Sequence, residues 1–325
     1  MKFKIDVSGK DREYLLSCFN DIFSTSSWSE GKYIKMFEED FGSYIGAQMV
    51  ATSSWAGAAM AVLEYIGVKD SVVLVPSNTF MATPLAAIKA GAKVEFVDCN
   101  RNDLCMSAED LKAKIKKFKP KVVILVHIGG HIAFETHEIV KLCKKNGIIL
   151  IEDCAHAHGA EFNGQKAGVF GLAGMYSFYA TKTMATGEGG CVVSNDKDLI
   201  AYARKYINYG KFEYTVQGLN YRMNEFNAAL GVWQTKKLPQ IIEWKNEKAK
   251  LYDSRYKSHL CLPKGMRSGF YKYIVFEPIK NSTGKVYDQP CHRIMKKEYD
   301  LPNSDWVAKN HWCVPIVYKG DNSND

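Results

Sequence analysis

The sequence has no apolar stretch long enough to form a membrane-spanning helix. Stretches such as Val122 to Val126 and Ile148 to Ile151 are far shorter than the roughly 18 residues needed to cross a bilayer. The amino-terminal residues, MKFKIDVSGK, lack the apolar centre and the small-residue cleavage site of a secretory signal. We therefore expect a protein that does not span a membrane and that is located in the cytoplasm.

The cysteines lack the spacing of a disulfide framework or a zinc ribbon. There are 9 of them, an odd number, and no two form a CxxC pair. Scattered single thiols are typical of a reducing compartment. The histidines at 127, 131, 156 and 158 follow two different predicted strands and lack the helical arrangement of a zinc motif. We therefore expect no metal.

Two further absences narrow the functional class. No GxGxxG follows the first predicted strand, which argues against a dinucleotide-binding dehydrogenase. The net charge of +8 suits either nucleic acid or an anionic small substrate. The densest basic run, from Lys112 to Lys121, alternates with apolar residues as the exposed face of an amphipathic helix does, and no helix-turn-helix signature is present. We therefore expect no nucleic-acid partner.

What is present is a regular alternation of strand-like and helix-like segments. At 325 residues, the chain is long enough for about two domains or one large one. Ser107 and Asp110 have the spacing of a helix-capping box. Short apolar strands separated by helices predict an α/β fold with a mostly parallel sheet, whose ligands bind beyond the carboxyl ends of the strands. Strands are predicted at 72–75, 93–97, 121–127 and 148–152, and helices at 81–90, 107–117 and 135–145.

The pattern changes after residue 170. Strands are predicted at 175–179 and 190–194, with a glycine-rich loop between them and a helix at 196–206. A long helix starts near Glu225, and we expect Pro239 to break or kink it. We predict a large domain over residues 1–240 and a smaller domain over 241–325, with the first 30 or so residues packing on the small domain.

Two residues near predicted strand ends carry the candidate chemistry. Asp153 follows a buried strand, where its carboxylate either faces the ligand crevice or caps the next segment. Lys182 lies in SFYATKTMATGEGG, between a strand and a glycine-rich loop. A lone loop lysine is usually a surface residue, but a desolvated lysine amine can form a Schiff base with a carbonyl. Pyridoxal phosphate requires such a lysine, an acid for its ring nitrogen and donors for its phosphate.

The same segments resemble the DegT/DnrJ/EryC1/StrS family of sugar aminotransferases. The likeness spans residues from about 28 to 318 and includes EDCAHAHGAEFNGQKAG, SFYATKTMATGEGG, VPSNTFMATPLAAIKAGAKVEFVD, VHIGGH and GLNYRMNEFNAALG. YDQPCHRI and HWCVPI match more weakly. The resemblance implies the fold of aspartate aminotransferase, with a large domain around a mostly parallel sheet and a smaller C-terminal α+β domain. It also implies pyridoxal 5'-phosphate as the cofactor.

The resemblance assigns roles to individual residues. Lys182 matches the lysine that forms the Schiff base and carries the proton, and Asp153 matches the acid that holds the pyridine nitrogen protonated. His156 falls where the family has a glutamine near the ring hydroxyl. Phe80 matches the aromatic residue stacked on the ring, and Ser177 matches a phosphate-binding hydroxyl.

Other matches imply a shared site. Asn220 corresponds to a phosphate contact delivered from the neighbouring subunit, so the resemblance implies a homodimer. Arg222 lies beside it, and His292 falls where the family has a pocket-lining histidine. We expect both to contact the substrate.

The sequence departs from the family pattern in two places. The first phosphate loop reads ATSSWAGA, which puts Trp55 and Ala56 where the family has Gly and Thr. The threonine hydroxyl is lost, so we expect Ser54, or Ser53, to bind phosphate together with the helix amides near Trp55. The chain also ends where relatives continue into a final helix.

The expected function is transfer of an amino group, with glutamate as donor, to a nucleotide-linked keto sugar in amino-sugar or polysaccharide biosynthesis. A dehydratase of the same fold, in which histidine replaces the lysine, is one alternative, against which the retained Lys182 argues. A non-catalytic regulator that binds the cofactor is another.

Overall fold

A seven-stranded sheet forms the centre of the molecule. The computed structural model describes residues 7 and 9–318. The strand order is β1-β9-β8-β5-β4-β2-β3, and the pairs among β3, β2, β4, β5 and β8 are parallel. Only β9 and β1, at one edge, run antiparallel to their neighbours. The strands are β1 (Gln48–Thr52), β2 (Val72–Pro76), β3 (Lys93–Val97), β4 (Val122–Val126), β5 (Ile149–Asp153), β8 (Gly174–Ser177) and β9 (Gly190–Ser194). The predicted mostly parallel α/β sheet is confirmed.

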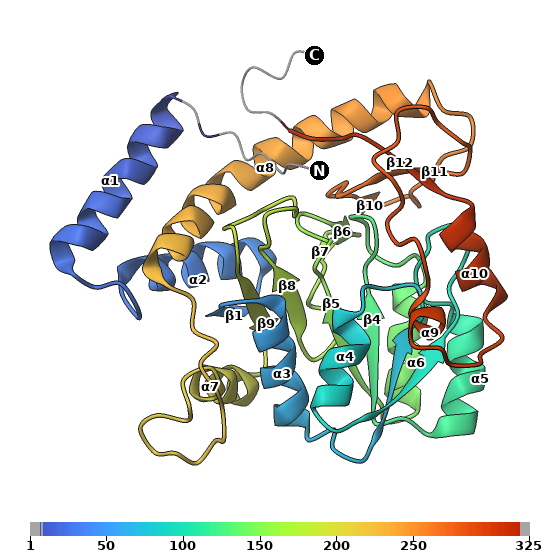
Figure 1. Cartoon of the computed structure of the whole chain (residues 1–325), viewed down its shortest axis with the longest axis horizontal. Coiled ribbons are helices and arrows are strands. Elements are labelled where there is room, and N and C mark those ends of the chain that lie inside the picture. The colour runs from blue at the N-terminus through green and yellow to red at the C-terminus, as the bar shows by residue number, and fades with distance from the viewer. Residues whose placement is uncertain (1–6, 8, 319–325) are drawn as a thin grey trace.

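Helices cover both faces of this sheet (Figure 1). Successive residues of a strand point to opposite faces of the sheet, and each face has its own hydrophobic core. Val50 and Val192 pack with α3, α4 and α7, whereas Met49 and Val193 pack with α2 and α8. A third core lies under α5 and α6. Burial of both faces explains why the central strands are apolar without alternation. The helices are α2 (Lys32–Ile45), α3 (Trp55–Ile66), α4 (Ala82–Lys89), α5 (Ala108–Phe118), α6 (Thr136–Lys145), α7 (Lys197–Tyr206) and α8 (Glu225–Asp253).

The predicted capping box at α5 is only half formed. The Ser107 hydroxyl accepts a hydrogen bond from the backbone N–H of Asp110, as expected of an N-cap. The Asp110 carboxylate does not return to Ser107; it accepts from the backbone N–H of Asp98 at 2.7 Å. The side chain therefore joins α5 to the end of β3. The basic residues Lys112, Lys116 and Lys117 are exposed, as the sequence pattern predicts.

Of the two effects expected of Pro239, a break or a kink, the break does not occur, because α8 runs continuously from Glu225 to Asp253. Figure 1 shows this helix, in orange, passing from α2 to the small sheet near the carboxyl terminus. Burial of α8 residues on both sides of Pro239, such as Leu238 and Ile242, offsets the loss of one backbone hydrogen bond.

The C-terminal part of the chain forms small elements around the end of α8. A two-stranded sheet of β11 and β12 packs with Ala249 of α8 in a separate core, and β10 pairs with β6 of the hairpin β6–β7. These elements are β6 (Glu161–Phe162), β7 (Gln165–Lys166), β10 (Met266–Arg267), β11 (Tyr273–Val275), β12 (Trp312–Val314), α9 (Cys291–Ile294) and α10 (Pro302–Lys309). Residue 240, the predicted domain boundary, lies in the middle of α8.

Helix α1 (Gly9–Thr25) packs on α8. The rings of Phe19 and Phe226 lie 5.5 Å apart, and Asp11 pairs with Lys237 at 2.9 Å. These contacts are with the first half of α8. The prediction that the chain ends before the final helix of its relatives concerns the C-terminal segment. Part of that segment, from residue 319 on, lies outside the described range. Among the described residues, no helix combines the length and apolar character needed to cross a membrane.

Candidate active site

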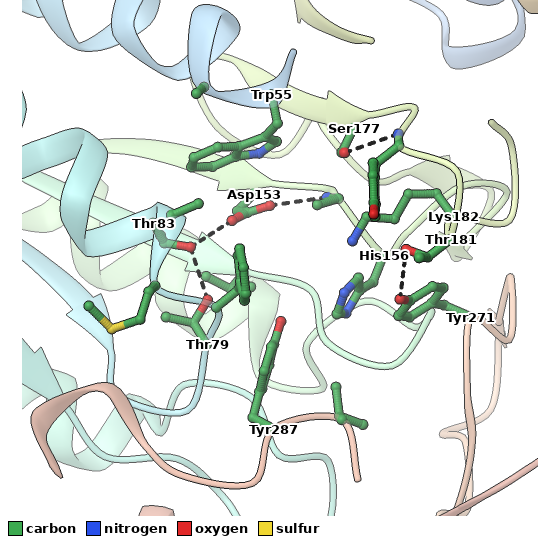
Figure 2. A pocket seen from close by; sticks show the side chains of 18 of the residues that line it. Trp55, Thr79, Thr83, Asp153, His156, Ser177, Thr181, Lys182, Tyr271 and Tyr287 are labelled. Atoms are coloured by element: carbon green, nitrogen blue, oxygen red, sulfur yellow. Dashed lines mark hydrogen bonds between the residues drawn. The ribbon is translucent and has the colours of Figure 1, made fainter. Parts of the chain in front are cut away.

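A cavity of about 830 Å³ opens where the parallel strands end. The last residues of β4, β5 and β8 reach it, together with the start of α3 and the loop that precedes α4. This is the place expected for ligands of a parallel sheet. Of the predicted site residues, the cavity is lined by Ser54, Trp55, Phe80, Asp153, His156, Ser177 and Lys182 (Figure 2).

Asp153 is almost fully buried, at 5% exposed, at the end of β5. Its Oδ2 accepts a hydrogen bond from the Thr83 hydroxyl at 2.9 Å, and its Oδ1 accepts from the Ala155 N–H at 3.0 Å. The carboxylate therefore both faces the cavity and caps the following turn. Burial raises the Asp153 pKa, although the hydrogen bonds and nearby Lys182 act in the opposite direction. A cationic ring nitrogen in the cavity would stabilise the charged form.

Lys182 extends from the loop between β8 and β9 into the same space (Figure 2). Its backbone N–H donates to the Tyr179 carbonyl at 2.9 Å, which forms a tight turn. Burial lowers the pKa of Lys182 from 10.5 to about 8, Asp153 opposes this shift, and Lys272 adds to it. At pH 7 about a tenth of the amine is therefore neutral, and hence nucleophilic, compared with less than about 0.1% at the ordinary pKa.

His156 lies between two aromatic rings. Tyr271 stacks on it with a centroid distance of 4.1 Å, and Tyr287 lies 5.9 Å away at a similar angle. Its Nδ1 is buried and has no hydrogen-bond partner among the described residues. Burial, followed by the charge of Lys182, keeps the pKa of His156 well below its usual value, so the ring is neutral. A neutral imidazole in the wall of the cavity suits a polar ligand group.

The start of α3 forms the other end of the cavity. Ser54 is the N-cap, and its hydroxyl accepts from the Gly57 N–H at 3.2 Å. The N–H groups of Trp55 and Ala56 have no acceptor within the helix, because the first amides of an α-helix precede the hydrogen-bonding ladder. Ser177 lines the same cavity. Helix amides and a serine hydroxyl are the donor set that a phosphate requires.

Three predicted residues lie outside this cavity. Arg222 donates to the Asn208 side chain at 2.5 Å, and Asn220 is exposed on the same segment. The expected substrate contact of His292 is wrong for this structure, because the side chain is fully buried and does not line the cavity. Its Nδ1 lies 2.7 Å from the Ser77 hydroxyl, so His292 anchors the loop after β2 instead.

Several lining residues were not predicted. Thr83 lies in the first turn of α4 and Thr79 in the loop before it; their hydroxyls are 3.0 Å apart, and both belong to the VPSNTFMATP segment. Tyr271 and Tyr287 come from a distant part of the chain, and no local pattern distinguishes them from packing tyrosines.

Beneath the cavity, Glu152 holds several segments together. In the described residues His127, Glu152 and Cys154 bring ligand-type atoms within 4.8 Å of one another. The Glu152 oxygens already accept hydrogen bonds from His127 Nε2 and from the backbone N–H groups of Gly168, Phe170 and Gly171. The Nδ1 of His127 accepts from the Ala133 N–H, which leaves Nε2 as the donor to Glu152. The acid is a structural anchor, so we propose no metal here.

Replacing Glu152 with glutamine is expected to lower the free energy of unfolding by about 2–6 kcal/mol, because an amide N–H₂ would face two buried N–H donors, each of which costs about 1–3 kcal/mol when left without an acceptor. Urea denaturation measures this change. Glu161→Gln is the matched control, since its ion pair with Lys166 is partly exposed and contributes at most about 1 kcal/mol. Equal, small losses in both variants would contradict the anchoring role.

Comparisons with known proteins agree with this geometry. The model of the DegT/DnrJ/EryC1/StrS aminotransferase family matches residues 10–283. A GDP-perosamine synthase from Vibrio cholerae is 34% identical over 261 residues, which cover 78% of this chain and 69% of that protein. A UDP-4-amino-4,6-dideoxy-N-acetyl-beta-L-altrosamine transaminase from Campylobacter jejuni is 35% identical over 268 residues, 79% of this chain and 68% of that protein. The solved structure of a DegT DnrJ EryC1 StrS aminotransferase from Brucella abortus superposes with a TM-score of 0.89 at 25% identity, covering 97% and 94% of the two chains.

Proposed function

The chain belongs to the DegT/DnrJ/EryC1/StrS aminotransferase family, and we propose that it uses pyridoxal phosphate to transfer an amino group from glutamate to a nucleotide-linked keto sugar. One observation carries the proposal. A partly neutral lysine, a buried carboxylate and a helix N-terminus meet in a single cavity. The two similar enzymes are named for GDP- and UDP-linked sugars, so a nucleotide-linked substrate is the shared feature.

The residues present fit the cofactor. Pyridoxal phosphate, when bound, supplies an electron sink that makes the α-hydrogen of an amino acid acidic. Lys182 would hold its carbonyl carbon, and Asp153 would pair with its ring nitrogen. The amides at the start of α3, with Ser54 and Ser177, would bind the phosphate.

The side chains of this cavity divide the work of the reaction. The Lys182 amine would be the base that takes the α-proton of the amino donor and delivers it to the carbonyl carbon of the cofactor, on the other side of the transferred nitrogen. Asp153, oriented by Thr83, would hold the ring nitrogen protonated. The His156 imidazole would contact the ring hydroxyl, and Phe80, which is 64% exposed in the cavity wall, would lie against the ring.

The first test is a spectrum of the purified protein with pyridoxal phosphate, before and after glutamate. We expect a visible band that bleaches with glutamate and returns when a nucleotide-linked keto sugar is added, with the amino sugar detected by mass spectrometry. A band that no amino donor changes would contradict amino transfer and favour the dehydratase or the regulator. No band at all would contradict cofactor binding.

Capture of pyridoxal phosphate by Lys182 is expected to accelerate with rising pH and to level off above about pH 8. The amine attacks a carbonyl only in its neutral form, so below the pKa the rate falls about tenfold per pH unit. Stopped-flow absorbance over a pH series measures this profile. A plateau reached only near the ordinary lysine pKa would show that burial does not activate the amine.

A homodimer is part of the proposal. Asn220 and Arg222 lie outside the cavity of their own chain, so a contact with the cofactor or substrate requires a second copy. Sedimentation velocity tests the dimer. Loss of cofactor binding in Asn220→Ala without loss of the dimer would support the shared site, and a monomer that binds the cofactor normally would refute it.

We also propose a cytoplasmic location, which the nine free thiols support.

A further inference from the structure

The glycine pair Gly129–Gly130 lies in the loop that follows β4, separated from the end of the strand by two residues, and has no role in the chemistry above. Both residues have positive φ, at 75° and 113°. A Cβ on Gly130 would lie 2.3 Å from the backbone nitrogen of Tyr271 and 2.7 Å from that of Phe270. Only glycine permits this approach of two backbone segments. The VHIGGH motif therefore serves as a docking turn for residues 268–272.

Hydrogen bonds hold this segment on both sides. Gly130 O accepts from the Gly269 N–H at 2.7 Å and from the Ser268 hydroxyl at 2.9 Å, and Gly129 O accepts from the Lys272 N–H at 2.8 Å. On the side of α8, the Lys245 ammonium donates to the Phe270 carbonyl at 2.8 Å. The backbone on either side of Tyr271 is thus anchored to both the sheet and the long helix.

The anchored segment places the Tyr271 side chain in the catalytic cavity. Its ring stacks on His156 at 4.1 Å, and the Lys182 nitrogen lies 4.9 Å from the ring centroid. Its hydroxyl donates to the Thr181 hydroxyl at 3.3 Å, next to Lys182 in sequence. Figure 2 shows Tyr271 beside His156, with the dashed bond to Thr181.

We propose that Tyr271 is a positioning residue of the catalytic site, held against His156 and Lys182 by docking of residues 268–272 on the Gly129–Gly130 turn. The ring fixes the imidazole plane and covers the side of the lysine that would otherwise face water. This inference rests on the proposed function, because Lys182 is assigned there as the reacting amine.

The charge environment predicts the direction of the effect. The charges of Asp153 and Lys272 shift the pKa of Lys182. The charge of Lys182 in turn lowers the pKa values of His156 and His158. Burial is the largest cause of the lowered pKa of Lys182. Removing the ring admits water, which favours the protonated amine, whereas loss of the weaker cation–π attraction acts in the opposite direction. The net expectation is a higher pKa and slower capture of a carbonyl at neutral pH.

The test compares Tyr271→Leu with Tyr271→Phe in the full-length protein, using pyridoxal phosphate as the probe. In the leucine variant the pH midpoint of capture is expected to rise by about one unit, which slows capture about tenfold near neutral pH. The phenylalanine variant keeps the ring and is expected to keep the midpoint. A slower leucine variant with an unchanged midpoint, or equal shifts in both variants, would overturn the proposal.

The docking turn is tested separately with Gly130→Ala. The methyl group meets the backbone of residues 270 and 271, so the pH midpoint is expected to rise as in Tyr271→Leu. Gly147→Ala is the matched control, because that glycine also has positive φ but an added Cβ meets nothing within 4 Å. If Gly130→Ala does not fold, Lys245→Met removes the opposite anchor and is expected to shift the midpoint in the same direction.

These outcomes separate the inference from the proposed function. If the wild-type protein forms no Lys182-dependent band, the proposed function fails, and the inference fails with it. If the wild-type band forms and its pH midpoint is the same in Tyr271→Leu, Gly130→Ala and Lys245→Met, only the inference fails.

Discussion

Replacing Lys182 with alanine is expected to lower the rate of amino transfer by at least about 10³-fold, because one change removes both the nucleophile and the proton carrier. The visible band produced by pyridoxal phosphate should disappear or change to the spectrum of non-covalently bound cofactor. Absorbance titration and a coupled assay of 2-oxoglutarate formation from glutamate measure both effects.

Two controls interpret this result. Lys182→Arg keeps a cation in the cavity but cannot act as a nucleophile, so it should be as inactive as the alanine variant. Lys197→Ala removes an exposed lysine at the start of α7 and should behave as the wild-type protein. A fully active Lys182→Ala enzyme would refute the assigned chemistry.

Replacing Asp153 with asparagine is expected to lower the rate by about 10²–10³-fold, the effect of losing one preorganised electrostatic partner of the transition state. Asparagine is nearly isosteric, and its carbonyl oxygen can still accept the hydrogen bond from Thr83 or from the Ala155 N–H. The missing element is the negative charge that holds a ring nitrogen protonated. Steady-state kinetics with glutamate, together with the spectrum of the bound cofactor, measure the loss.

Stability separates this charge effect from damage to the fold. Burial raises the Asp153 pKa, so the buried charge is unfavourable in the absence of a cationic partner. Asp153→Asn should therefore unfold at the same denaturant concentration as the wild-type protein or a higher one. Thr83→Val, which removes the hydrogen bonds of this hydroxyl to Asp153 and Thr79 but keeps the carboxylate, should lower the rate less than Asp153→Asn does. A large loss of stability in Asp153→Asn would indicate a structural role instead.

The strands were predictable because both faces of the sheet are buried. Val122–Val126 is apolar at every position and the other central strands are mostly so, and this leaves short apolar segments that stand out between amphipathic helices. Pro239 shows the limit of local reasoning. The disruptive effect of a proline on an isolated helix is offset here because α8 residues before and after Pro239 are buried. The local sequence pattern does not reveal that packing.

The sequence by itself predicted the parallel α/β architecture and singled out Asp153 and Lys182, which the structure brings to one cavity, because strand periodicity and strand-end motifs are local features. Only the tertiary structure decided that Thr83 orients Asp153, that Tyr271 reaches Lys182 from a segment about 90 residues away, and that His292 lies outside the cavity. The physical reason is that such contacts depend on how distant backbones approach one another. At Gly129–Gly130 the approach of residues 268–272 depends on two glycines and on the hydrogen bond that Lys245 of α8 donates to Phe270. No local propensity encodes that these segments meet.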